Sequence, residues 1–314
     1  MILIRPLDLR FGIFSTFSIQ LGGARLTHGW RRFRTLALGA ILALALIDVA
    51  HAGPISVFVS ILPQKYFVER IAGPLADVSV MVGPGDSPET YEPKPRQVAQ
   101  LTRARAYFAI GVPFERVWMA RLRAANPDMA IVDTTAGIRR RSADDSSGSN
   151  GTSDPHVWTN PAFVKLMAAH IRDAFLRLDP QHAADYERNY RQFAADLDAL
   201  DGEIRTRLSP FAGRAFLVFH AAWGYFADAY GLRQIPIEAE GKEPGPRTLA
   251  GIIDEAKALG CKVVFVQPQF SRANADMIAR AIDGRVVALD PLAGDYIENM
   301  RHVAAAIAES MGPS

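Results

Sequence analysis

The stretch PQHAADYERNYRQFAADLDALDGEIRTRL, residues 180–208, has large apolar side chains spaced three and four residues apart. This spacing places them on one face of an α-helix; they are Tyr186, Tyr190, Phe193, Leu197, Leu200, Ile204 and Leu208. Pro180 directly after Asp179 is typical of a helix start. A helix of this length extends roughly 40 Å, which is long for a compact domain. We therefore expect it to run along two lobes and to fix them relative to each other.

Short β-branched runs alternate with amphipathic stretches on both sides of this helix. We expect strands over 55–61, 78–82, 106–110, 130–132, 215–219, 263–267 and 286–289. Such alternation is typical of βαβ units with parallel sheets. The segments 66–73 and 225–231 both begin Tyr-Phe and end in glycine, a weak internal repeat. The sequence thus predicts an α/β protein with two similar lobes, parallel sheets flanked by helices, and one long rigid linker helix between them.

Residues 1–52 have the layout of a secretory signal peptide. Three arginines precede an apolar run over residues 36–50, which ends in a small-x-small triplet closing with Ala52. The run is too short for a comfortable membrane span, and a short buried helix is the alternative. We expect cleavage after Ala52 and a periplasmic location.

The rest of the chain divides into an N-terminal lobe (53–178), the linker helix (179–209) and a C-terminal lobe (210–314). Residues 139–153 contain no apolar side chain except Ala143. A segment of that composition buries too little surface to offset its ordering entropy, so we expect a flexible surface loop.

Charge and cysteine content narrow the function classes. The chain has a net charge of +2, but residues 1–52 hold six Arg and only two Asp, so the exported part is near neutral. Such a balance gives no electrostatic footprint for nucleic acid. No cysteine follows the expected cleavage site closely, and Cys261 is the single one in the chain. We expect a soluble monomer without a lipid anchor or an internal disulfide.

Four loops after predicted strands carry side chains of the metal-binding type: 84–93, 154–158, 219–223 and 289–292. In open α/β sheets, ligands bind beyond the carboxyl ends of the strands. His156 and His220 lie in two of these loops, each near a tryptophan that would shield a site from water. Spacing alone leaves another interpretation open, because a lone histidine is commonly a satisfied polar residue and an Asp-Pro pair is commonly a turn.

Five motifs together resemble the cluster A-I solute-binding proteins, the metal receptors of zinc and manganese ABC importers, and are similar to the zinc-uptake component A family. They are Ser87-Pro-Glu-Thr-Tyr-Glu-Pro-Lys-Pro95, Asp154-Pro-His-Val-Trp158, His220-Ala-Ala-Trp-Gly-Tyr-Phe226, Glu243-Pro-Gly-Pro246 and Asp290-Pro-Leu292. The resemblance covers residues 53–314 in matching order and spacing. It implies a non-enzymatic receptor with the metal between two lobes and a membrane permease as its partner.

Carried over residue by residue, the resemblance implies four metal ligands: Glu89, His156, His220 and Asp290. Glu89 is a departure, because zinc members usually have histidine there. Two imidazoles and two carboxylates suit tetrahedral zinc, yet they also permit the higher coordination of Mn²⁺ or Fe²⁺. The Irving–Williams order makes such a site bind zinc more tightly than manganese, so binding strength alone does not identify the transported ion. Weighing the frequency of zinc members in the family against the ligand chemistry, we expect Zn²⁺, with Mn²⁺ or Fe²⁺ as the alternatives.

Two other functions compete with this interpretation. The first is an exported metallohydrolase that uses the same residues, which needs an open coordination position and a general base. The sequence contains neither His-Glu-x-x-His nor Gly-x-Ser-x-Gly, and we interpret Glu92 as a partner that orients a metal ligand rather than as a base. The second is an adhesion or scaffold protein that shares only the fold.

Overall fold

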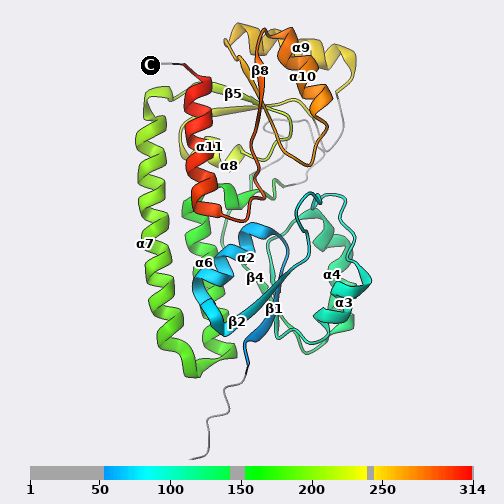
Figure 1. Cartoon of the computed structure of the whole chain (residues 1–314), viewed down its shortest axis with the longest axis vertical. Coiled ribbons are helices and arrows are strands. Elements are labelled where there is room, and N and C mark those ends of the chain that lie inside the picture. Colours follow the sequence, from blue (N-terminus) through cyan, green and yellow to red (C-terminus); the bar gives the residue numbers. More distant parts are fainter. Residues whose placement is uncertain (1–52, 142–152, 239–243, 313–314) are drawn as a thin grey trace, which may run out of the picture. The chain divides into compact units, whose positions relative to one another are not determined.

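A computed structural model describes residues 53–141, 153–238 and 244–312 (Figure 1). The predicted signal peptide, most of the predicted loop 139–153 and Glu243 lie outside the described residues.

Eight short strands form the two sheets of the molecule. They are β1 (Ile55–Val59), β2 (Ala76–Val80), β3 (Ala106–Ala109), β4 (Ala130–Asp133), β5 (Ala215–Val218), β6 (Arg233–Pro236), β7 (Val263–Val266) and β8 (Arg285–Ala288). The first sheet has the order β2-β1-β3-β4 and the second β6-β5-β7-β8, and every pairing is parallel. Because the two orders are equivalent, the prediction of two similar α/β lobes is confirmed.

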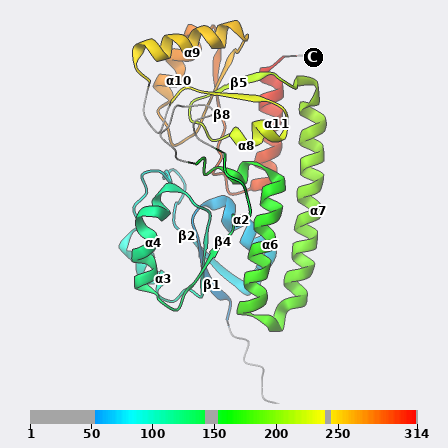
Figure 2. The same cartoon turned by 180° about the vertical axis from the view of Figure 1, so that it is seen from behind.

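Helices flank both sheets (Figures 1 and 2). They are α2 (Leu62–Ala72), α3 (Pro95–Leu101), α4 (Pro113–Ala125), α6 (Pro161–Leu178), α7 (Ala183–Leu208), α8 (Gly224–Ala229), α9 (Pro246–Ala258), α10 (Arg272–Ala281) and α11 (Tyr296–Ser310). Single 3₁₀ turns lie at η1 (Gly73–Leu75), η2 (Val157–Thr159), η3 (Pro180–His182) and η4 (Ser209–Phe211). Across the described part of the chain, no helix combines the length and apolar character needed to cross a membrane.

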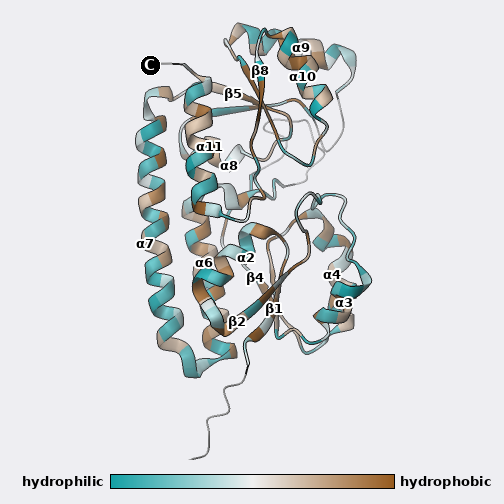
Figure 3. Cartoon of the chain, viewed as in Figure 1, coloured by the Kyte–Doolittle hydropathy of each residue, from teal (hydrophilic) through white to brown (hydrophobic). Residues whose placement is uncertain are grey.

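The long helix predicted from residue 180 is present as α7, but its first turn differs. Pro180–His182 forms the 3₁₀ turn η3, and the α-helix begins at Ala183. The carboxylate of Asp179 does not cap the backbone; it accepts hydrogen bonds from the hydroxyl of Tyr186 and from Nδ1 of His182, each at 2.6 Å. Beyond this turn the predicted apolar face is buried except for Tyr190, which is half-buried, and Figure 3 shows hydrophobic and hydrophilic patches alternating along α7.

Helix α7 joins the two lobes through one continuous apolar core. It packs against α2 and α6, which belong to the first lobe, and against α11, which follows the second sheet. At this junction the ring of Phe67 on α2 lies 6.0 Å from Phe193 on α7 and 5.0 Å from Tyr296 on α11. All three rings are buried in the same cluster of side chains. The long helix is therefore part of the core rather than a free linker.

Parallel pairing also decides where the loops lie. All four strands of a sheet end at the same edge, so the segments after β2 and β4 share one edge of the first lobe. The segments after β5, β6, β7 and β8 share one edge of the second. These segments contain every residue that the sequence singles out for metal binding.

We predict that Leu197→Ala in α7 lowers the free energy of unfolding by about 2–5 kcal/mol, because removing the leucine side chain leaves a cavity in the core that the two lobes share. Leu197 is 1% exposed, whereas its neighbour Asp198 makes a surface ion pair with Lys165. Asp198→Ala is the matched control and should change stability by less than about 1 kcal/mol. Chemical denaturation of both variants measures the difference, and equal effects would contradict the assignment of α7 to the core.

Candidate metal centre

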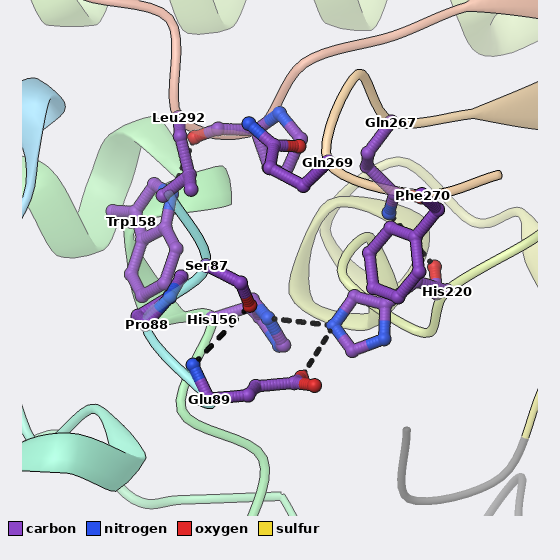
Figure 4. Close-up of a pocket in the computed structure, with 11 residues that line it drawn as sticks. Ser87, Pro88, Glu89, His156, Trp158, His220, Gln267, Gln269, Phe270 and Leu292 are labelled. Atoms are coloured by element: carbon purple, nitrogen blue, oxygen red, sulfur yellow. Dashed lines mark hydrogen bonds and ion pairs between the residues drawn. The ribbon is translucent and has the colours of Figure 1, made fainter. Parts of the chain in front are cut away.

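Three side chains from different loops converge on one point (Figure 4). Glu89 follows β2, His156 follows β4 and His220 follows β5, so the first two come from one lobe and the third from the other. Each offers one metal-binding atom, and these atoms lie within 4.8 Å of one another. Nε2 of His220 is 2.9 Å from Oε1 of Glu89 and 3.3 Å from Nε2 of His156. The structure thus brings together three of the four residues that the sequence singles out.

Asp154 fixes the orientation of His156. Its Oδ1 accepts a hydrogen bond from the backbone N–H of His156 and a second one from the ring Nδ1, each at 2.9 Å. An ionised carboxylate only accepts hydrogen bonds, so Nδ1 is the donor and Nε2 points toward the cluster, where it contacts Nε2 of His220. Burial works to raise the pKa of Asp154, but the hydrogen bonds from His156 outweigh burial and hold that pKa below its usual value.

Glu238 has the same role for His220. It is 4% exposed, and its Oε1 accepts a hydrogen bond from Nδ1 of His220. The imidazole is further held by Phe270, whose ring stacks on it at 5.0 Å with an interplanar angle of 23°. Glu238 lies just after β6, and its backbone N–H donates to the carbonyl of Phe219 beside His220. Each histidine is therefore held at Nδ1 by a carboxylate of its own lobe, which leaves Nε2 of both for a ligand.

The charges of Glu89 and His220 are coupled in the free site. Burial would lower the pKa of His220, but hydrogen bonds to Glu238 and Glu89 outweigh burial and raise it to about 9. Burial would likewise raise the pKa of Glu89, and the hydrogen bond with His220 outweighs that effect and lowers it. The site is thus an ion pair at neutral pH. A metal ion and a proton compete for Nε2 of His220, because only the unprotonated nitrogen binds a metal.

A small pocket of about 20 Å³ lies beside the three side chains, room for a single ion or water molecule. Trp158 lines it, with its ring 5.2 Å from that of His156. The indole N–H of Trp158 donates to the carbonyl of Pro291 at 2.7 Å, which ties the His156 loop to the loop after β8. The predicted shielding of the site by tryptophan is therefore seen on this side of the pocket.

Asp290 is not part of the three-residue cluster. Its Oδ1 accepts hydrogen bonds from the backbone N–H of Leu292 at 2.9 Å and from the amide of Gln269 at 3.2 Å. Pro291 and Leu292, the next two residues, line the pocket. Asp290 is therefore held at the edge of the site, and its role as the fourth ligand stays a prediction.

The carboxylates that orient the histidines differ from the one inferred from sequence. Glu92 is exposed. Asp154 and Glu238, rather than Glu92, are the carboxylates that orient the candidate metal ligands. The three other histidines of the described chain lie elsewhere: Nδ1 of His170 contacts the carbonyl of Thr134, His182 pairs with Asp179, and His302 is exposed. Asp154 could have been found from its place two residues before His156, whereas no sequence signal marks Glu238.

The geometry of the two imidazoles fits a divalent transition metal. In a tetrahedral zinc site with Zn–N bonds of about 2.0–2.1 Å, neighbouring donor nitrogens lie roughly 3.3 Å apart. The two Nε2 atoms here are separated by 3.3 Å. Sites for zinc and other first-row metals typically contain imidazole rings that are held at one nitrogen by a carboxylate and bind the metal through the other. The two rings here are held in this way, and the Glu89 carboxylate lies beside them.

The family model for the zinc-uptake complex component A, periplasmic, matches residues 57–310. The chain belongs to this family. Its members are periplasmic solute-binding components of metal importers and not enzymes, so the metallohydrolase alternative is rejected.

Relatives in the family differ in the metal that their names state. The high-affinity zinc uptake system protein ZnuA of Brucella abortus is 35% identical over 148 residues, which is 46% of this chain and 44% of that protein. The iron-binding protein YfeA of Yersinia pestis is 30% identical over 235 residues, covering 72% of this chain and 75% of YfeA. A crystal structure of ZnuA superimposes with a TM-score of 0.79 at 42% identity, covering 82% of this chain and all of that one.

We predict that Glu238→Gln weakens metal binding about tenfold, the lower end of the effect of losing a partner that orients a metal ligand. The amide keeps the shape and one acceptor oxygen but loses the charge that supports His220. Glu92→Gln is the matched control, because Glu92 is exposed and is not the Nδ1 partner of either histidine. Isothermal titration with Zn²⁺ measures both variants, and an unchanged affinity in Glu238→Gln would contradict the role given to Glu238.

Proposed function

We propose that this chain captures a divalent transition metal ion in the periplasm and delivers it to the membrane permease of an ABC importer. The observation that carries the proposal is the convergence of Glu89, His156 and His220, with Nδ1 of each histidine held by a carboxylate. Family membership supports the delivery step and the periplasmic location. One chain supplies all the candidate ligands, so a monomer suffices.

Asp290 completes the coordination in this proposal. Its Oδ1 is occupied by Gln269 and Leu292, so Oδ2 is the oxygen that it would offer to the ion. Two neutral imidazoles and two carboxylates then balance the charge of a divalent cation. A closed set of protein ligands suits a carrier, because it leaves no open coordination position for catalysis.

Zinc is the favoured cargo, with manganese or iron as the alternative. Two nitrogen donors and the zinc-uptake relatives favour zinc. Glu89 supports the alternative, because a carboxylate can bind through both oxygens and so raise the coordination number toward that preferred by Mn²⁺ or Fe²⁺. The iron-binding relative YfeA shows that the family is not confined to one metal.

Equilibrium dialysis of metal-free protein against mixed Zn²⁺, Mn²⁺ and Fe²⁺, with free zinc buffered to scarcity, tests this proposal. One zinc per chain is the expected result. One manganese or iron retained against zinc would make Glu89 the residue that sets specificity. Binding of no metal in stoichiometric amount would overturn the proposed function.

We predict that Glu89→Ala and His220→Ala each weaken metal binding by at least about a hundredfold, because each removes a ligand from a small closed site and leaves its ionic partner unpaired. His302→Ala is the matched control, because this histidine is exposed on α11. The His302→Ala protein should bind metal with the same affinity as the wild type. Competition with a chromophoric chelator measures all three variants. Wild-type affinity in both ligand variants would exclude the assigned site.

The adhesion alternative makes no use of the clustered ligands. An adhesion protein does not require two buried imidazoles to present Nε2 to one small pocket. No feature of the described residues favours it over metal capture.

A further inference from the structure

Arg141 lies where the loop that carries His156 meets the second lobe. The backbone N–H of Asp154 donates to the carbonyl of Arg141 at 3.1 Å, so the two residues are neighbours in space. The guanidinium lies 3.8 Å from Oδ2 of Asp154, the carboxylate whose Oδ1 holds the His156 ring. Arg141 is thus in electrostatic contact with the group that orients a candidate metal ligand.

The same guanidinium reaches helix α8 of the second lobe. It donates to the carbonyl of Gly224 at 3.2 Å and pairs with the carboxylate of Asp228. Helix α8 begins four residues after His220, so its position and that of His220 are linked along the chain. One arginine side chain therefore joins the carboxylate behind His156 to the segment that carries His220.

Tyr225 makes a second connection across the same contact. Its hydroxyl accepts a hydrogen bond from the backbone N–H of Arg141 at 2.8 Å and donates to the carbonyl of Asp154 at 2.9 Å. Helix α8 also packs against η2, the turn that directly follows His156. The two lobes are therefore joined by directional hydrogen bonds at Asp154, the residue whose carboxylate holds the His156 ring.

Gly224, the first residue of α8, lies very close to the side chains of Arg141 and Asp154. A Cβ atom at this position would lie 2.9 Å from Nε of Arg141 and 3.0 Å from Oδ2 of Asp154. Real Cβ atoms essentially never come closer than 3.0 Å to another heavy atom, so a side chain at Gly224 would force Arg141 to shift and would crowd Asp154.

We propose that Arg141 is a positioning residue of the metal site, which clamps the His156 loop onto helix α8 and thereby fixes the separation of the His156 and His220 rings. The inference rests on the proposed function, since it concerns how well those rings hold an ion. Arg141 does not touch the metal; it acts through Asp154 and α8. Without it, Asp154 keeps its bonds to His156 but loses its charged connection to the second lobe.

A double-mutant cycle on the full exported chain tests this inference with Zn²⁺ affinity as the readout. Arg141→Ala should weaken binding about tenfold in the wild-type background, as expected for a group that orients a ligand. The same change should cost less than about twofold in an Asp154→Asn background, because groups that act through each other are not additive. The visible absorption of the Co²⁺-loaded protein should also change in Arg141→Ala, because that spectrum reports the coordination geometry. Arg141→Gln serves as a milder second variant if Arg141→Ala does not fold.

Arg301→Ala is the matched control, because Arg301 also joins separate elements by an ion pair, to Glu203 on α7, but lies away from the cluster. It should leave both the affinity and the Co²⁺ spectrum unchanged. Wild-type affinity and spectrum in Arg141→Ala, or the same loss of affinity in both Asp154 backgrounds, would overturn the clamp while leaving the proposed function intact. Failure of the wild-type chain to bind Zn²⁺ or Co²⁺ would overturn both.

Discussion

The candidate metal centre depends on two carboxylate–imidazole pairs. Asp154 and Glu238 each accept a hydrogen bond from Nδ1 of one histidine, so Nε2 is the ring nitrogen left for a metal ion. The two Nε2 atoms face each other across the site at 3.3 Å. The rest of the molecule serves to hold these two pairs, one from each lobe, in that relation.

The fold achieves this through parallel sheets and a shared core. Parallel pairing delivers the loops after β2 and β4 to one edge of the first lobe, and those after β5, β6 and β8 to one edge of the second. Helix α7 and the rings around Phe67 belong to one apolar cluster that includes side chains of both lobes, while the second lobe has a further apolar cluster of its own. The directional contacts of Arg141, Tyr225 and Trp158 then join the two edges close to the site.

Features marked by long apolar patterns could be predicted from the sequence, and features made by long-range contact could not. The stripe from Tyr186 to Leu208 predicted α7, and β-branched runs predicted seven of the eight strands. The strand β6 was missed because Arg-Gln-Ile-Pro has a single buried residue and lies at a sheet edge, where proline is tolerated. Glu238, which follows it, was missed for the same reason. Glu89, His156 and His220 were found through motif resemblance, whereas their mutual distances depend on two lobes that no local pattern relates.

The most direct test of this account is the position of a bound ion in crystals of the zinc-loaded protein, located by anomalous diffraction at the zinc edge. We expect one strong peak per chain, in contact with the Glu89 carboxylate and with Nε2 of both His156 and His220. A peak bound by other residues, or one that contacts only one of the two imidazoles, would contradict it.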